Sequence, residues 1–578
     1  MIPPALDDRE LHNVEGRSHA VHDRQVMRHP HDTCGAAHPA HCGRRYSQPT
    51  RRASMILLIL MPAIIPKPVI GLITSATMLR LLVAAALPLG IDESYAAVVS
   101  RTLSLSYFDH PPAVFWMAHA AAWLGGESPF ALRWPFVLLF ALTSGLLYLL
   151  TARLFGARAG FWATLAAQVI PVFSLSSGSW VLPDGPLLCG SVAAALALSH
   201  AASVSRTDAD GVHTAATHRT TWTPWLLLGL ALGLAGLSKY HAALLGLGVA
   251  VFVLTDRGSR RSLGTVPPYV AVLIALLCVV PVFVWNAQHE WVSFRFQAGR
   301  AAGSGSPVTA VLQNLAGQAG YVLPWFWVPL VFVMVRGLRA GPTRRMTWFC
   351  CCLGAAPVLV FTLASLGGRA GLPHWPAPGF FLLLPLLGDA IARWELRTPQ
   401  TARRSMTGAV VMFVALLSIV VSHAATGWVA NVVPSLHTRD PAFELLEYRS
   451  LRDSLTARGL LAPARFVATA DWMRAAKIGY ALGPARPVLV LNDDSRHFRF
   501  AFDADTVVAR DGLFLLKVPS NVTGDSATVL AAPQRSRFER LEYVGVMPVL
   551  RGADTALTLA VFTAWQLRRG WSLPSAER

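Results

Sequence analysis

The chain has 578 residues, of which 53% are hydrophobic and only 14% are charged, and its mean hydropathy is +0.45. Soluble domains are typically about 25% charged, so these values argue against a soluble enzyme and against disordered, collagenous or disulfide-scaffold proteins. The formal net charge of +18 comes mostly from arginines in short gaps between apolar runs, which does not favour nucleic-acid binding. We therefore expect a large multi-span membrane body with some soluble sequence attached.

The first 54 residues are polar and contain seven of the eighteen histidines. They show no apolar periodicity, and their cysteines and histidines lack a clear zinc-finger spacing. We expect residues 1–54 to be a disordered extension, or sequence upstream of a true start at Met55.

Residues 55–424 alternate apolar stretches with short polar gaps and form the expected transmembrane catalytic region. The run from Met55 to Pro66 is short and bounded by proline, so we expect it to be interfacial. Eleven further stretches approach the ~20 residues that a bilayer-spanning helix needs. They begin near residues 69, 131, 157, 185, 223, 240, 266, 310, 347, 377 and 406.

Basic residues predict the orientation of these spans. With the N-terminus in the cytoplasm, the inner loops contain fifteen arginines and the opposite loops contain five. Inner loops of membrane proteins carry the excess of Lys and Arg. An odd number of spans then places the C-terminal region outside, which is the periplasmic face of a bacterial inner membrane.

The composition changes over residues 425–578, where acidic residues return. Four short β-like runs surround a predicted helix at Trp472–Leu482, which favours a small α/β domain on the outer side. The predicted strands lie at Arg465–Thr469, Pro487–Leu491, Gly512–Val518 and Thr558–Trp565.

Acidic residues gather on the outer side of the predicted membrane body. Asp92 and Glu93 directly follow the first span, Asp109 lies further along the first outer loop (92–130), and Asp184 starts the fourth span. Each of them could also be a helix-capping residue. Charges near a bilayer are costly, so their concentration on one face favours a functional site.

Several basic residues are expected on the same face. Cations there could hold a lipid phosphate leaving group while a carboxylate deprotonates an incoming hydroxyl. A divalent cation (Mg²⁺, Mn²⁺ or Zn²⁺) bound by Asp109 could assist. The expected substrate-binding cations are Lys239, Arg295, Arg300, Arg369 and His374.

Five motifs on this face, in this order, carry a family resemblance. They are Asp92-Glu93, the Tyr-Phe-Asp-His-Pro-Pro of 107–112, the Pro-Asp-Gly-Pro-Leu of 183–187, Trp285-Asn286 with Trp291, and the His-Trp-Pro-Ala-Pro of 374–378. Residues 69–500 thereby resemble the GT-C membrane glycosyltransferases, in the branch of the protein O-mannosyltransferases and the lipid A aminoarabinose transferase.

The resemblance implies inverting transfer of a sugar from a polyprenyl-phosphate carrier. Asp92 matches the family's acidic residue proposed as catalytic base, and Glu93 is expected beside it in the catalytic set. Asp109 matches a metal-ligating acidic position and completes that set. His110 matches a basic residue that faces the donor phosphate, although the aminoarabinose transferase has lysine there, and Asp184 matches a second acidic position near the site.

The expected partners are the polyprenyl-phosphate sugar, an envelope acceptor and membrane lipids, without nucleic acid. The acceptor could be lipid A or another part of lipopolysaccharide, another lipid or a protein, and the sugar stays open. A transporter or flippase of a lipid-linked or anionic substrate is the alternative. The one-sided acidic cluster and the lack of inverted sequence repeats argue against transport.

Overall fold

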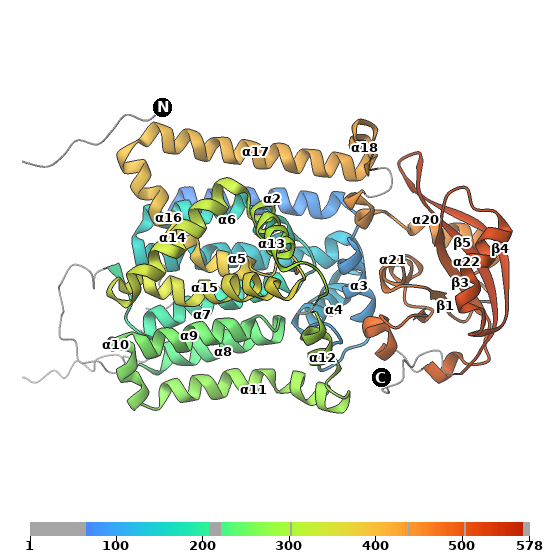
Figure 1. The fold of residues 1–578 in the computed structure, drawn as a ribbon, viewed down its shortest axis with the longest axis horizontal. Helices are drawn as coiled ribbons and strands as arrows, with labels where there is room; N and C mark the ends of the chain where they lie inside the picture. Colours follow the sequence, from blue (N-terminus) through green and yellow to red (C-terminus); the bar gives the residue numbers. More distant parts are fainter. Residues whose placement is uncertain are drawn as a thin grey trace, which may run out of the picture. The chain divides into compact units, whose positions relative to one another are not determined.

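Helices run through most of the chain up to residue 432 and precede a C-terminal sheet (Figure 1). This computed structural model describes residues 65–206, 221–300, 303–433, 435–436, 440–501 and 504–569. The predictions for residues 1–54 and for most of the run from Met55 to Pro66 lie outside the described residues.

A helix begins at or near the start of each of the eleven predicted spans. One long helix, α14, had no separate counterpart in the prediction. The twelve helices are α2 (Lys67–Ala86), α5 (Pro129–Phe155), α6 (Ala157–Val169), α7 (Asp184–Ala201), α8 (Trp222–Ser238), α9 (Ala242–Thr255), α11 (Pro267–Gln288), α13 (Pro307–Val322), α14 (Pro324–Ala340), α15 (Arg345–Ala364), α16 (Ala377–Arg397) and α17 (Pro399–Thr426).

Fewer of these helices are long and apolar enough to span a membrane than the eleven that the sequence predicted. Five described helices are long and apolar enough, and up to seven if two bent pairs each count as one span. The pairs bend by 89° after α9 and by 112° between α13 and α14. The count of eleven is not reached: α6 and α8 have only 13 and 17 residues against the ~20 of a straight span, and α7 and α16 also lie outside the qualifying set. The polytopic helical class itself is confirmed.

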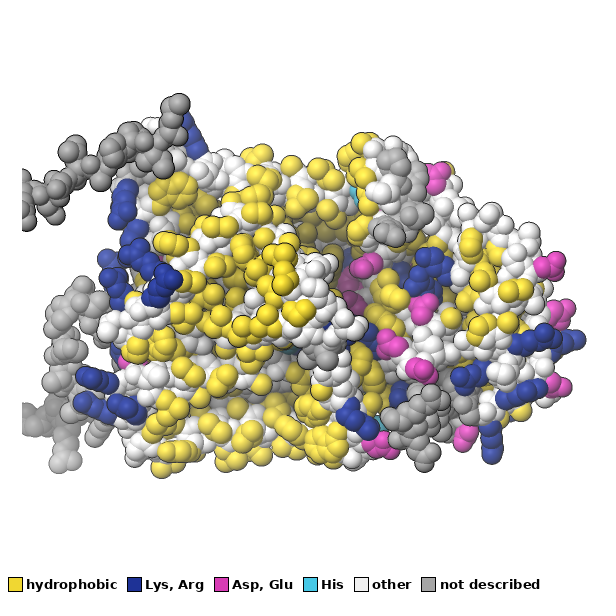
Figure 2. All heavy atoms as spheres, in the orientation of Figure 1, with side chains coloured by type: hydrophobic (Ala, Val, Ile, Leu, Met, Phe, Trp, Pro, Cys, Tyr) yellow, Lys and Arg dark blue, Asp and Glu magenta, His cyan; other side chains and the backbone are white. Residues whose placement is uncertain are grey.

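The helices pack side by side around α5, α6, α15 and α16, which bury aromatic and aliphatic side chains against their neighbours. Close backbone approach explains several glycines: a Cβ at Gly388 of α16 would lie 2.4 Å from the carbonyl oxygen of Ala159. The face of the bundle seen in Figure 2 is mostly hydrophobic. Apolar lateral surface is what a lipid bilayer requires of a spanning bundle.

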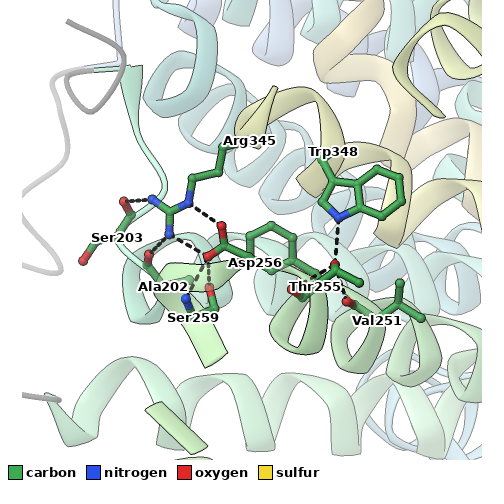
Figure 3. A network of polar contacts seen from close by, with 9 residues as sticks. Ala202, Ser203, Val251, Thr255, Asp256, Ser259, Arg345 and Trp348 are labelled. Carbon is green, nitrogen blue, oxygen red and sulfur yellow. Dashed lines mark hydrogen bonds and ion pairs between the residues drawn. The ribbon is translucent and has the colours of Figure 1, made fainter. Parts of the chain in front are cut away.

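Arg345 ties together several connections at the end of the bundle remote from the sheet (Figure 3). Its guanidinium donates to both oxygens of Asp256 at 2.9 and 3.0 Å and to the carbonyl oxygens of Ala202 and Ser203 at 2.6 and 3.0 Å. Asp256 also accepts from the backbone N–H and the hydroxyl of Ser259 at 2.8 and 2.6 Å. The start of α15 is thereby fixed to the ends of α7 and α9.

The C-terminal domain contains a mixed five-stranded sheet in the order β2-β1-β3-β5-β4. β1 pairs in parallel with β2 and β3, while β5 pairs antiparallel with β3 and β4. This confirms the expected C-terminal α/β domain. Its strands are β1 (Val467–Thr469), β2 (Val488–Val490), β3 (Gly512–Val518), β4 (Phe538–Arg551) and β5 (Asp554–Leu567), and its helices are α20 (Arg449–Ala457), α21 (Trp472–Leu482) and α22 (Gly524–Arg535).

Helix α21 joins this domain to the short helix α3 (Ile91–Val99), which follows α2. Apolar residues of both helices share one buried cluster. The ammonium of Lys477 donates to the carbonyl oxygen of Leu89 at 2.6 Å, and burial lowers its pKa to about 8. The sheet domain is therefore anchored on the segment that carries Asp92 and Glu93.

Replacing Arg345 with alanine should destabilise the bundle. Asp256 is buried and would lose its cation, and a buried acceptor left without its partner costs roughly 1–3 kcal/mol. The apparent Tm of the purified protein in detergent should therefore fall. Arg339→Ala is the control because Arg339 is exposed, and an equal fall in both variants would contradict the assignment to the Asp256 network.

Candidate active site

Helix α3 is held in place by a buried ion pair. Nε and Nη2 of Arg133 on α5 donate to Glu93 at 2.7 and 2.5 Å. The same carboxylate accepts from the backbone N–H groups of Gly90 and Val181 at 2.8 and 3.1 Å. Burial favours the protonated acid, but Arg133 outweighs it and lowers the pKa of Glu93. With both oxygens occupied, Glu93 has a structural role in place of the predicted catalytic one.

Asp92 faces a different direction from its neighbour, because successive helical residues are rotated by about 100°. Its side chain is exposed to solvent. The protein around it nevertheless removes part of the water that would stabilise the charged carboxylate. This environment raises its pKa to about 6, and the negative charges of Glu444 and Asp109 contribute. A carboxylate with this pKa is mostly ionised at neutral pH and is a stronger base than an ordinary aspartate.

Asp109 lies buried beside Asp92, in the loop between α3 and α4 (Ala113–Gly125). Its Oδ1 accepts a hydrogen bond of 3.0 Å from the hydroxyl of Tyr95, and its Oδ2 lies 3.5 Å from Nη1 of Arg496. Gln297 of α12 (Val292–Gly299) donates to its backbone carbonyl at 2.6 Å. The Asp109 loop is thus held from three separate parts of the chain.

Asp184 and Lys239 form a second buried ion pair. Nζ of Lys239 lies 2.9 Å from each carboxylate oxygen of Asp184. Asp184 is the first residue of α7, and Lys239 occupies the extended break between α8 and α9. Lys239 is the one lysine between residues 68 and 476, and its ammonium is paired with a carboxylate rather than directed to solvent.

Two loop histidines face this pair. Burial, together with the charge of Lys239, lowers the pKa of both His110 and His374 to about 4. Nδ1 of His110 is buried and has no hydrogen-bond partner among the described residues. Both imidazoles are therefore neutral at pH 7, and His110 presents an unused polar atom beside Asp109, Asp184 and Lys239.

The predicted arginines divide into two groups. Arg300 is half-buried, stacks 4.9 Å from the ring centre of Trp375, and is influenced by the charges of Asp109, Asp92 and the exposed Arg369. Arg295 is exposed and pairs with Glu290 at 3.2 Å. The structure thus places Arg300 near the carboxylates, with Arg369 close to Arg300, and places Arg295 outside that cluster.

The C-terminal domain supplies site residues that sequence reasoning missed. Arg496 reaches Asp109 and stacks between Phe296 and Trp472, 4.8 and 4.5 Å from their ring centres. The neighbouring His497 is buried and accepts from the backbone N–H of Phe108 at 3.2 Å. The one signal for these residues in the sequence is the basic and aromatic run of residues 496–500. In the structure, Arg496 adopts a left-handed backbone conformation with φ of +52°.

The side chains near Asp109 do not fit the expected divalent cation. No group of three His, Cys, Asp or Glu residues in the described part of the chain could hold a metal ion. The carboxylate of Asp109 instead faces a phenol and a guanidinium. No chemical step is therefore assigned to a metal here.

The resulting site combines an accessible base with a cationic, partly buried surround. Cations positioned where negative charge develops can stabilise an anionic leaving group. A space-filling view shows acidic side chains in a recess where the bundle meets the sheet domain (Figure 2). This arrangement suits transfer of a group from a phosphate to a nucleophile.

Residues 109–285 match the family model of dolichyl-phosphate-mannose-protein mannosyltransferases. The chain is also 26% identical over 327 residues to the lipid A galacturonosyltransferase RgtD of Rhizobium johnstonii, covering 55% of this chain and 63% of that protein. It is 26% identical over 314 residues to the undecaprenyl phosphate-alpha-4-amino-4-deoxy-L-arabinose arabinosyl transferase of Edwardsiella ictaluri, covering 51% and 52% respectively. This chain is related to the GT-C membrane glycosyltransferases.

The fold agrees with this GT-C relationship. The crystal structure of ArnT from Cupriavidus metallidurans bound to undecaprenyl phosphate covers 88% of this chain and 98% of its own, with a TM-score of 0.56 at 16% identity. The chain spans less than two thirds of the length of the two sequence relatives. The predicted fold class is confirmed, and the sequence similarities agree with the predicted relationship.

The raised pKa of Asp92 can be measured directly. Carbodiimides modify protonated carboxyl groups, so labelling of Asp92 in the purified protein should rise as the pH falls through about 6. Replacing Glu444 with glutamine removes a neighbouring negative charge and should move this midpoint to lower pH. Mass spectrometry of the Asp92 peptide gives the readout, and labelling confined to pH values below about 4, the range of an ordinary aspartate, would contradict the proposed environment.

Proposed function

We propose that this GT-C relative is a glycosyltransferase that moves a sugar from a polyprenyl-phosphate carrier to an envelope acceptor. The observation that carries the proposal is the pairing of an accessible, high-pKa carboxylate, Asp92, with a cationic surround that includes Arg300 and Arg496. Asp92 is suited to deprotonating an acceptor hydroxyl, and the cations are suited to stabilising a phosphate leaving group.

In the proposed reaction, Asp92 takes the proton of an acceptor hydroxyl as its oxygen attacks C1 of the sugar. The C1–oxygen bond to the carrier breaks, and polyprenyl phosphate leaves with the bonding electrons. Lys239, Arg300 and Arg496 favour this step electrostatically because negative charge grows on the departing phosphate. The attack from the opposite face inverts the anomeric centre.

His110 is proposed to contact the phosphate as a neutral hydrogen-bonding group. Its buried, unpartnered Nδ1 would gain a partner there. An incoming phosphate would also raise the low pKa of this imidazole, since nearby negative charge favours the protonated form. Asp184 holds Lys239 in position rather than acting as an acid or base, because both of its oxygens accept from the ammonium.

The names of the relatives support an undecaprenyl-phosphate sugar as donor and lipid A as acceptor. One relative is a lipid A galacturonosyltransferase, and another is an undecaprenyl phosphate aminoarabinose transferase. A uronic acid or an amino sugar is therefore the first class of donor to examine. The recess with the acidic side chains lies where the bundle meets the sheet domain (Figure 2), which supports a role for that domain in acceptor selection.

The proposed orientation places the sheet domain and the site at the periplasmic face, with the N-terminus in the cytoplasm. Figure 2 shows basic side chains concentrated at the opposite end of the bundle. The helix ends near that end carry Arg257 and Arg260 of α10 (Arg257–Arg260), Arg339 of α14 and Arg404 of α17. An excess of basic residues is typical of cytoplasmic ends.

A reconstituted transfer assay tests this function. The purified full chain should be incubated with lipid A and with undecaprenyl-phosphate galacturonate or aminoarabinose in turn. One donor should yield free undecaprenyl phosphate together with lipid A heavier by one sugar, both measured by mass spectrometry. Asp92→Asn should lower this rate by about 10²–10⁴-fold, the usual contribution of general-base catalysis.

Glu290→Gln is the matched control because Glu290 is an exposed acidic residue of the same outer region that pairs only with Arg295 among the described residues. It should retain the wild-type rate. Near-normal transfer by Asp92→Asn would remove Asp92 from the mechanism. Movement of the donor across a vesicle membrane without cleavage of its sugar–phosphate bond would instead support the transporter alternative.

A further inference from the structure

A second cationic cavity lies at the end of the bundle remote from the sheet domain. It has a volume of about 480 Å³ and is enclosed by residues of α14, α16 and the start of α15. Four arginines line it: Arg336, Arg344, Arg393 and Arg397. This volume falls within the usual range for a small-molecule or headgroup site.

The positive charge of this cavity is poorly compensated. Asp389 is its single acidic lining residue, and that carboxylate pairs with Arg393. Arg336, Arg344 and Arg397 have no ion pair with a carboxylate in the described part of the chain. Three guanidinium groups are therefore available to one bound anion.

A neighbouring cavity shows that this imbalance is not general at this end of the bundle. That cavity, of about 560 Å³, contains Arg158 and Arg403. Both of these arginines pair with Glu395, at 3.5 and 2.9 Å. A carboxylate therefore pairs with both arginines of this neighbouring cavity, whereas three of the four arginines in the first cavity have no such partner.

An apolar stripe leads along α14 to the cationic cavity. Trp325, Val328 and Phe332 are 41%, 56% and 60% exposed, and Arg336 follows at the next helical turn. Residues with this spacing lie on one face of a helix. Phe332 also lines the cavity, so the stripe and the arginines form one continuous surface.

We propose that this surface binds an anionic bilayer phospholipid, with its phosphate held by the arginines and an acyl chain along the α14 stripe. The structural ion pair at the start of α15 is made by Arg345 with Asp256 (Figure 3). The adjacent Arg344 is not needed for that contact and can bind a phosphate. Guanidinium groups match the geometry of phosphate oxygens. Basic pockets between membrane helices are known to take phospholipid headgroups of this kind. The proposal is independent of the glycosyl-transfer site at the other end of the bundle.

Native mass spectrometry of the detergent-solubilised full chain provides the test, with cardiolipin as the anionic probe and phosphatidylcholine as the zwitterionic comparison. Wild type should bind cardiolipin preferentially. The double variant Arg336→Gln/Arg397→Gln should bind it about tenfold more weakly or worse. The control Arg339→Gln/Arg404→Gln removes the same charge from the neighbouring helix ends, outside the cavity lining, and should change the affinity less than about twofold.

An equal loss of cardiolipin affinity in both double variants would overturn the proposal, because the loss would then come from the overall positive charge at this end of the bundle and not from the cavity. Unchanged binding in Arg336→Gln/Arg397→Gln would also overturn it. Displacement of cardiolipin by equimolar inorganic phosphate would assign the cavity to a soluble anion instead. If the double variant has a lowered apparent Tm, the single variants Arg336→Gln and Arg397→Gln should each show a smaller loss in the same direction, and the absence of such a loss would reject the site.

Discussion

The buried ion pair between Glu93 and Arg133 is the constraint on which the site depends. Two charges taken out of water require close mutual pairing, and removing one partner typically costs about 3–5 kcal/mol. Arg133 also donates to the carbonyl oxygens of Leu87 and Pro88 at 2.7 and 2.8 Å, so it fixes the connection into α3 as well as the helix itself. The orientation of Asp92 follows from this anchoring, because a rigid helix leaves the adjacent residue on a different face.

The sheet domain completes the site rather than merely adjoining it. Helix α21 packs against α3, and Arg496, in a later segment of the same domain, contacts Asp109. The backbone N–H of His497 donates to the Tyr95 hydroxyl at 3.1 Å, and that hydroxyl in turn donates to Asp109. A hydrogen-bonded chain therefore connects the two parts of the molecule at the carboxylate. The C-terminal domain therefore places Arg496 and His497 beside the carboxylates of the membrane bundle.

Patterns within short segments predicted the structure well. The predicted helix at Trp472–Leu482 and the predicted strand at Gly512–Val518 coincide with α21 and β3. Strand β4 was missed because Gly545 and Pro548 interrupt its apolar run at 544–550, and both residue types are disfavoured within strands. The separate helix α14 was also missed, since hydropathy continues across the break at Leu323, where the chain bends by 112°.

The site was predictable only where its residues share a motif or a membrane face. Charge and sidedness brought Asp109, Asp184 and Lys239 together correctly, but they could not reveal that Lys239 is bound to Asp184. They also could not distinguish Asp92 from Glu93, because that difference depends on the distant Arg133. Arg496 lies 387 residues from Asp109 in the chain, and only tertiary structure shows their contact.

Lipids extracted from cells test the central claim most directly, because they report both the donor and the need for Asp92. Cells lacking this protein should be compared with cells restored with wild type or Asp92→Asn, with polyprenyl-phosphate sugars measured by mass spectrometry. A glycosylated carrier should accumulate in the null and Asp92→Asn cells and fall to its normal level with wild type. Flat donor levels and unchanged envelope glycans in all three strains would contradict the assignment of this chain as a glycosyltransferase.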